Sequence, residues 1–115
     1  MYDLIVDQNN DNYKFSQDIH FLTDFVEVKK NDKIMEFGTG SGIIPLLLAK
    51  KKPDFESIIA LELQEEQFEL ARKNVINNNL SEKIFIKNID VREVRNFFEA
   101  KQIDTIVSNP PFYKA

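Results

Sequence analysis

The 115-residue sequence contains no cysteine and no tryptophan, and it has a single histidine, His20. Without cysteine the chain can form neither a disulfide bond nor a thiolate metal site, and one histidine cannot build a histidine-rich metal site. We therefore expect no metal and no metal-dependent chemistry. Ten phenylalanines and a hydrophobic content of 43% nevertheless predict a packed globular domain rather than a disordered chain.

Long apolar runs and a basic leader are also missing. The chain opens with Met1-Tyr2-Asp3, and no hydrophobic stretch reaches the roughly 20 residues that a membrane-spanning helix needs. We expect no membrane association, and a cytoplasmic location is the default. A net charge of -4, from 15 basic and 19 acidic residues, gives no electrostatic argument for nucleic-acid binding. The basic runs at 29–30 and 50–52 are either contacts for RNA phosphates or solvated helix ends.

The length of the chain allows one compact domain but not two independently folded ones. Short apolar segments alternate with segments of helical periodicity. We expect strands at residues 33–37, 57–62, 83–87 and 103–107, and helices at residues 43–52, 64–78 and 91–101. This alternation predicts an α/β fold, a Rossmann-like parallel sheet with flanking helices. A ligand crevice should then lie beyond the carboxyl ends of the strands, after Phe37, Leu61, Ile89 and Val107.

Residues 1–32 form an N-terminal segment ahead of the core, which we assign to residues 33–115. Ser16 can cap a helix that runs to Val26, and Asp18 is well placed near the positive end of that helix. We expect this helix to flank the crevice, after a short strand at 2–7 and a polar turn at 8–12. The last expected strand would leave an exposed sheet edge, so we interpret the chain as part of a longer one.

All three glycines of the sequence, Gly38, Gly40 and Gly42, lie in the segment Glu36-Phe37-Gly38-Thr39-Gly40-Ser41-Gly42 between a strand and a helix. Glycine permits positive φ angles and close approach of a ligand, and the following helix offers free N–H groups. Ile43 replaces the third glycine of the dinucleotide pattern, and no Gly-Lys-Ser/Thr sequence is present. The segment therefore predicts a nucleotide-binding turn, but it disfavours both an NAD enzyme and an ATPase.

Two acidic residues follow strands. Glu62 comes 20 residues after Gly42, the spacing expected of an acid that accepts the ribose hydroxyls of a nucleoside. Asp90 follows the third strand, where its carboxylate could accept a hydrogen bond from an adenine amino group or could cap the next helix. We give these two interpretations of Asp90 equal weight.

The segment Ser108-Asn109-Pro110-Pro111-Phe112-Tyr113 comes directly after the fourth expected strand. Consecutive prolines stiffen the backbone where the crevice should open. The Asn109 side chain and the Pro110 carbonyl supply two acceptors that can converge on one amine, and Phe112 can stack on a planar base. The alternative is a double-proline turn with Phe112 anchored in the core.

Together these motifs resemble class I S-adenosylmethionine-dependent methyltransferases, over nearly the whole chain. The Asn-Pro-Pro-Phe ending resembles the amino-methylating branch, and the segments at 15–18 and 38–48 resemble its bacterial tRNA adenine methyltransferases acting on valine tRNA. The resemblance implies S-adenosylmethionine as the cofactor and RNA as the partner. It implies cofactor contacts at Gly38, Thr39, Gly40, Gly42, Glu62, Leu63, Asp90, Val91 and Asn109, with Ser16 and Asp18 as secondary positions. It places the target amine at Asn109, Pro110 and Phe112.

Three alternatives stay open. Phe112 also occurs at this position in guanine-amine methyltransferases of ribosomal RNA. The same motif holds a glutamine amide in release-factor methyltransferases, although their usual N-terminal helical domain is longer than residues 1–32. In a third alternative, the chain only binds a nucleotide. Nothing in the sequence predicts an oligomeric state.

Overall fold

The computed structural model describes residues 17–108, with side chains from residue 19 onward. These residues form a four-stranded sheet in the order β3-β2-β1-β4. Its strands are β1 (Lys33–Phe37), β2 (Ser57–Leu61), β3 (Ile84–Lys87) and β4 (Thr105–Ser108). All three strand pairs are parallel. The predicted Rossmann-like α/β fold is confirmed.

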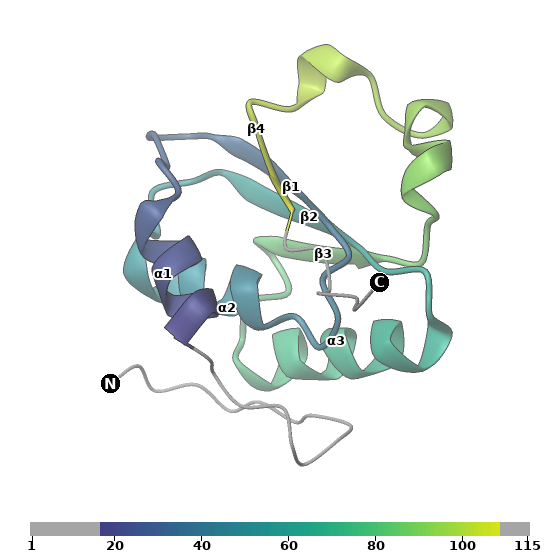
Figure 1. Ribbon diagram of the computed structural model, residues 1–115, viewed down its shortest axis with the longest axis horizontal. Coiled ribbons are helices and arrows are strands. Elements are labelled where there is room, and N and C mark those ends of the chain that lie inside the picture. Colours follow the sequence, from purple (N-terminus) through teal and green to yellow (C-terminus); the bar gives the residue numbers. More distant parts are fainter. Residues whose placement is uncertain (1–16, 109–115) are drawn as a thin grey trace.

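Three helices lie on one side of this sheet: α1 (Gln17–Phe25), α2 (Ile43–Lys51) and α3 (Glu65–Asn77) (Figure 1). Side chains alternate between the two faces of each strand. Those that share the hydrophobic core with the helices include Ile34, Ile58, Ala60, Ile84, Ile86 and Val107. On the opposite face Phe85 and Ile106 are exposed. Within the described residues, the helices therefore cover one face of the sheet.

Helix α2 is the centre of the core. Residues 43–48 are all buried, and this helix is apolar on every side, as expected of a helix enclosed by other elements. Pro45 causes no break because it lies in the first turn, where backbone N–H groups have no intrahelical partner. The sequence therefore forms its most buried helix directly after the glycine segment.

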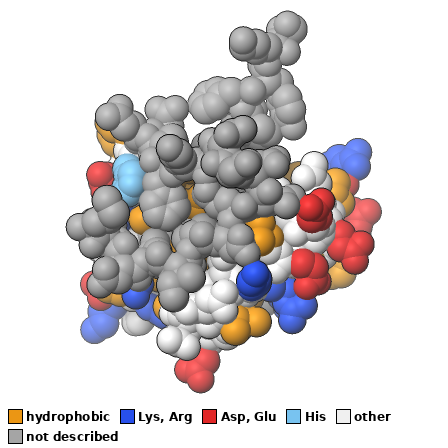
Figure 2. Space-filling model, turned by 90° about the horizontal axis from the view of Figure 1, so that it is seen from below, with side chains coloured by type: hydrophobic (Ala, Val, Ile, Leu, Met, Phe, Trp, Pro, Cys, Tyr) orange, Lys and Arg blue, Asp and Glu red, His pale blue; other side chains and the backbone are white. Residues whose placement is uncertain are grey.

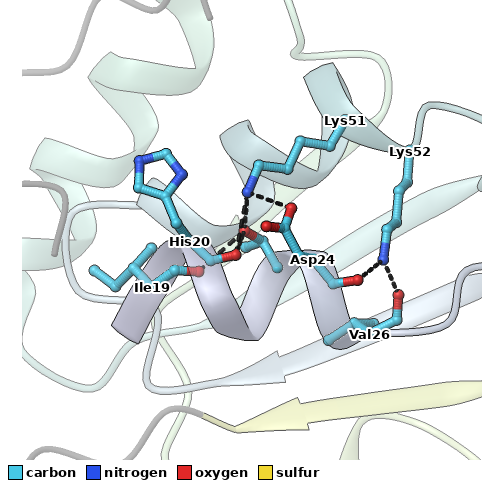
Figure 3. Close-up of polar contacts among 7 residues, drawn as sticks. Ile19, His20, Asp24, Val26, Lys51 and Lys52 are labelled. Atoms are coloured by element: carbon cyan, nitrogen blue, oxygen red, sulfur yellow. Dashed lines mark hydrogen bonds and ion pairs between the residues drawn. The ribbon is translucent and has the colours of Figure 1, made fainter. Parts of the chain in front are cut away.

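Two lysines at the end of α2 bind the end of α1, and we call Lys51 and Lys52 the lysine clamp (Figure 3). The Lys51 ammonium donates to the Thr23 hydroxyl at 2.7 Å and to the His20 carbonyl at 3.2 Å, and it pairs with Asp24 at 2.9 Å. The Lys52 ammonium donates to the backbone carbonyls of Asp24 and Val26. Because the Asp24 carbonyl lies in the last turn of α1, where carbonyls lack intrahelical partners, the Lys52 cation satisfies it and offsets the helix dipole. Two of the lysines considered as RNA contacts thus hold helices together.

The prediction of a helix at residues 91–101 is wrong. The structure has two short 3₁₀ helices there, η1 (Val91–Asn96) and η2 (Ala100–Gln102), and neither contains a buried residue. Most helix stability in proteins comes from packing an apolar face, and this segment fully buries none of its apolar side chains. Strand β4 also begins two residues later than expected, because Ile103 ends η2 and the Asp104 carboxylate accepts the Lys33 N–H at 2.9 Å.

Other expectations concern residues beyond the described range. The strand at 2–7, the turn at 8–12 and the Ser16 cap lie outside it, and Asp18 is described only as part of the α1 backbone. Among the helices at 17–108, none has the length and apolarity to cross a bilayer. The same residues contain no group of three histidine, cysteine or acidic side chains placed to hold a metal ion.

Candidate functional site

The order of the strands places a switch point between β1 and β4. The chain moves outward from β1 through β2 to β3 and then returns to pair β4 with the other side of β1. In open α/β sheets, ligands bind beyond the carboxyl ends of the strands at such a point. Phe37, the last residue of β1, is in register with Ser108, the last residue of β4. The glycine segment and the Asn-Pro-Pro-Phe segment therefore start from adjacent strand ends, although Asn109, Pro110 and Phe112 lie outside the described residues.

The glycine loop, residues 38–42, has a backbone that favours glycine at three positions. The φ angles are 74° at Gly38, 61° at Gly40 and 87° at Gly42, a region that other residues rarely adopt. A Cβ added at Gly42 would lie 3.4 Å from the Ala71 Cβ, whereas one added at Gly38 or Gly40 would meet nothing within 4 Å. The loop is therefore packed against α3 at its end and open at its beginning, where a ligand can approach the backbone.

Glu62 supports this loop from the end of β2. One carboxylate oxygen accepts the Gly40 N–H at 2.8 Å, and the other accepts the Gln64 N–H at 3.0 Å. The side chain is buried. Each carboxylate oxygen has two lone-pair positions, so both can still accept a hydroxyl from a ligand. The structure thus brings the predicted ribose acid into direct contact with the predicted cofactor loop.

Asn88, which the sequence analysis did not single out, joins the ends of β2 and β3. Its side-chain amide donates to the Glu62 carbonyl at 2.9 Å and to the Leu63 carbonyl at 3.0 Å. This bridge holds the acid-containing end of β2 beside the segment that leads to Asp90. Leu63 and Val91, which each follow one of the predicted acids, are exposed.

Asp90 caps a helix, as one of its two interpretations predicted. Its carboxylate accepts the backbone N–H of Arg92 at 2.9 Å, at the start of η1. The Arg92 guanidinium adds hydrogen bonds of 2.6 to 3.1 Å to both oxygens. These hydrogen bonds from Arg92 lower the pKa of Asp90 below its ordinary value. Together they use the acceptor positions that an adenine amino group would need.

Glu36 is a buried acid at the start of the glycine segment, and it was not predicted as a site residue. It lies on β1 with 1% of its surface exposed, and neither carboxyl oxygen has a hydrogen-bond partner among the described residues. Burial raises the pKa of Glu36 from 4.5 to about 8, and the charge of Glu62 adds to the rise. The Thr39 hydroxyl opposes this rise in pKa, although the two side chains make no hydrogen bond of ordinary geometry.

Asn74 was also missed, because inside a polar helix it carries no sequence signal. It is completely buried on α3, and its side-chain amide donates to the Ser41 carbonyl at 2.8 Å. One turn earlier on the same face, Ala71 is the residue that an added Cβ at Gly42 would meet. Helix α3 therefore contacts the glycine loop through two neighbouring side chains.

The charged surface near α3 is mixed. In Figure 2, acidic and basic side chains lie next to one another where the surface is not drawn in grey. On α3 itself, Glu69 and Arg72 form an exposed ion pair at 3.7 Å. Such a mixture produces no field of one sign, so this part of the surface gives no electrostatic support for RNA binding.

Comparison with known proteins adds information to this geometry. Release factor glutamine methyltransferase from Streptococcus pneumoniae is 42% identical over 92 residues, which are 79% of this chain and 29% of that protein. The tRNA1(Val) (adenine(37)-N6)-methyltransferase from Christiangramia forsetii is 37% identical over 83 residues, 71% of this chain and 34% of that protein. The crystal structure of TrmN from Thermus thermophilus superposes with a TM-score of 0.67 and 29% identity, covering 81% of this chain and 27% of that chain.

This chain thus spans less than half of the length of the curated relatives it matches, from 28% to 46%. A family model described as the methyltransferase small domain matches residues 14–115. That match contains the whole described fold, with the glycine loop, Glu62 and the strand end at Ser108. The chain belongs to the methyltransferase small domain family.

Proposed function

We propose that this chain is the cofactor-binding part of an enzyme that transfers a methyl group from S-adenosylmethionine to an exocyclic amine of an RNA base, adenine in a tRNA. The observation that carries the proposal is the register of Phe37 with Ser108 at the switch point. This register starts the cofactor loop and the amine-binding segment from neighbouring strand ends. Residues 33–115 are the catalytic core in this proposal, and the segment at 1–32 flanks the cofactor.

The nucleoside part of the cofactor fits the ends of β2 and β3. Glu62 keeps acceptor positions for the ribose hydroxyls while it holds Gly40. Leu63 and Val91 offer exposed apolar side chains for the two faces of the adenine ring. For Asp90 to accept the adenine amino group, Arg92 must release one of its hydrogen bonds. The Arg92 side chain is 83% exposed, so it is free to move into solvent.

The amino-acid part of the cofactor fits the beginning of the glycine loop. Glu36 has two carboxyl oxygens without a partner among the described residues, and Thr39 has an unpartnered hydroxyl. A buried carboxylate is stable only beside a positive group or strong hydrogen-bond donors. The ammonium group of the cofactor would supply such a partner and would return Glu36 to its charged form.

The proposed transfer needs no strong general base. Asn109 and the Pro110 carbonyl would bind the two hydrogens of the amine, and Phe112 would stack on a base flipped out of an RNA loop. S-adenosylmethionine would supply an electrophilic methyl group for in-line attack by the amine lone pair, with S-adenosylhomocysteine as the neutral leaving group when the carbon–sulfur bond breaks. The nitrogen becomes acidic once it is methylated, so its proton leaves late to water.

A second candidate substrate is the side-chain amide of glutamine in a protein. The observation that favours it is the 42% identity with a release factor glutamine methyltransferase. A primary amide is planar and presents two hydrogens, as an exocyclic base amine does, so the same segment could hold either group. Methyl transfer by the natural protein to purified tRNA, compared with a glutamine-containing peptide, separates the two substrates.

The cofactor is tested by calorimetric titration of this chain with S-adenosylhomocysteine and, separately, with NADH. We expect wild type to bind S-adenosylhomocysteine alone, and Glu62→Ala to weaken binding by about tenfold or more because it removes the ribose acceptor. Binding of NADH in place of S-adenosylhomocysteine would refute the proposal. Binding without transfer to either substrate would favour a nucleotide-binding module.

The amine site is tested in the natural protein with Asn109→Ala. We expect methyl transfer to be abolished while S-adenosylhomocysteine affinity stays within about twofold of wild type, because the amine contacts matter chiefly in the transition state. If this variant instead loses cofactor binding and keeps its rate at saturating cofactor, Asn109 serves the cofactor and not the target amine.

A further inference from the structure

The contact between α3 and the glycine loop is polar at a place where an apolar contact would suffice for packing. Asn74 has no exposed surface, and its neighbours in sequence and space include the buried core residues Ala71 and Val75. Burying an amide costs free energy unless its hydrogen bonds are made. A polar residue at this position is therefore explained by what its amide binds, the Ser41 carbonyl at 2.8 Å.

That hydrogen bond fixes one peptide plane of the loop. The Ser41 carbonyl belongs to the same rigid peptide unit as the Gly42 N–H, which donates to the Thr39 carbonyl at 3.1 Å. With both ends of this unit held, the φ angle of 87° at Gly42 is maintained from outside the loop. Helix α2 begins at the next residue, so the same peptide also sets how the loop enters that helix.

The loop is held from two directions. Glu62 binds the Gly40 N–H from the end of β2, and Asn74 binds the Ser41 carbonyl from the last turn of α3. Glu62 would change partners or share them when a ribose binds, whereas Asn74 is buried behind the loop and would not meet the ligand. The two side chains therefore have different tasks, one in contact with the ligand and one behind it.

We infer that Asn74 is a positioning residue for the cofactor site, which holds the Ser41–Gly42 peptide in its binding geometry before the ligand arrives. The inference rests on the proposed function in that it names the ligand as S-adenosylmethionine or its product. A loop held in this way loses little conformational entropy when the ligand binds, and the smaller entropic cost increases the affinity.

The test compares Asn74→Leu with Val75→Ala. Leucine has a similar size but no donor, and Val75 is the next residue of α3, buried in the core. We expect S-adenosylhomocysteine to bind Asn74→Leu about tenfold or more weakly and Val75→Ala within about twofold of wild type, at a temperature where circular dichroism shows all three folded. Asn74→Ser, which keeps a donor, should recover part of the affinity. If Asn74→Leu does not fold, Asn74→Ala takes its place.

A second measurement needs no ligand. Amide hydrogen exchange at Gly40 and Gly42 should be faster in Asn74→Leu than in wild type and unchanged in Val75→Ala. If wild type does not bind S-adenosylhomocysteine, the proposed function fails, and faster exchange would still support the positioning of the loop. A folded Asn74→Leu with wild-type affinity and wild-type exchange would overturn the inference and leave the proposed function intact.

Discussion

The two ends of α2 are both joined to the rest of the molecule by polar contacts, but the contacts differ in kind. At the C-terminal end, the lysine clamp satisfies carbonyl groups of α1, and the Lys51 side chain is 5% exposed. At the N-terminal end, Glu62 and Asn74 hold the glycine loop, while Glu36 and Thr39 keep polar atoms without partners among the described residues. The first junction is complete without a ligand, whereas the second leaves hydrogen-bonding capacity for one. Substitutions at the two junctions should therefore affect different properties.

The largest effect is expected from Glu36→Gln. Burial raises the pKa of Glu36 to about 8, so its contribution to stability is fully present below the unfolded pKa and is lost as pH rises through about 8. The free energy of unfolding of wild type should therefore fall between about pH 5 and pH 9 by on the order of a few kcal/mol more than that of the variant. Urea denaturation at both pH values measures this difference. Parallel pH profiles for the two proteins would contradict the burial of a carboxyl group at this position.

Lys51→Met tests the clamp. The substitution removes the two hydrogen bonds that the buried Lys51 ammonium donates to the Thr23 hydroxyl and the His20 carbonyl, which should lower the free energy of unfolding by about 2 kcal/mol. Affinity for S-adenosylhomocysteine should stay within about twofold because the clamp lies at the far end of α2. The matched control is Lys50→Met, an exposed neighbour expected to change stability by less than about 0.5 kcal/mol. A Lys51→Met protein that is stable but cannot bind cofactor would remove the distinction between the two junctions.

Gly42→Ala tests the loop. Alanine at a φ of 87° costs about 1 kcal/mol in backbone strain, and its Cβ would also fill the space up to the Ala71 Cβ, at a distance of 3.4 Å. Gly38→Ala is the control, since its φ of 74° carries similar strain without any atom within 4 Å. We expect Gly42→Ala to be the less stable of the two in thermal denaturation. Equal melting temperatures would show that α3 does not limit the space at Gly42.

Asp24→Asn should have the smallest effect. The hydrogen bond from Lys51 lowers the pKa of Asp24 below its ordinary 3.8, so its contribution is present above that value and is lost as pH falls through the lowered pKa. Since the carboxylate is largely exposed, water and salt weaken the ion pair. The melting temperatures of wild type and variant should differ slightly near neutral pH and converge in acid. A difference in melting temperature that grew as the pH fell would contradict a lowered pKa of Asp24 in the folded protein.

The sequence was sufficient to predict the four strands and the helices on either side of β2. In these elements the period of the apolar residues matches the geometry of a strand or a helix, because those residues must all lie on the buried face. The segment after β3 could not be predicted in this way. A helix was expected at 91–101, but Val91 and Phe97 are exposed there, and the Asp90 cap with its hydrogen bond to Arg92 favours a short local turn instead.

The candidate site was predictable where a residue type and a strand end coincide, as at Gly40 and Glu62. Glu36 and Asn74 could not be predicted as site residues because their roles depend on burial and on partners that are distant in the sequence. Asn74 lies 33 residues from Ser41 in the chain, and no local pattern links the two. Glu36 lies on the core face of β1, a fact that needs the packed helices to be known.

The pairing of β1 with β4 also has a consequence for how the molecule assembles. The contact that begins this pairing, between Lys33 and Asp104, joins residues 71 positions apart, and β4 follows the other three described strands in the chain. Closing so long a loop costs more entropy than forming the neighbouring β1–β2 pair, so among the described strands we expect the β1–β4 pair to form after the β1–β2 pair. Until then β1 is an open edge to which other strands can add. If the cofactor contacts the ends of both strands, as the proposed function requires, its binding stabilises this most distant pairing and is thermodynamically linked to folding.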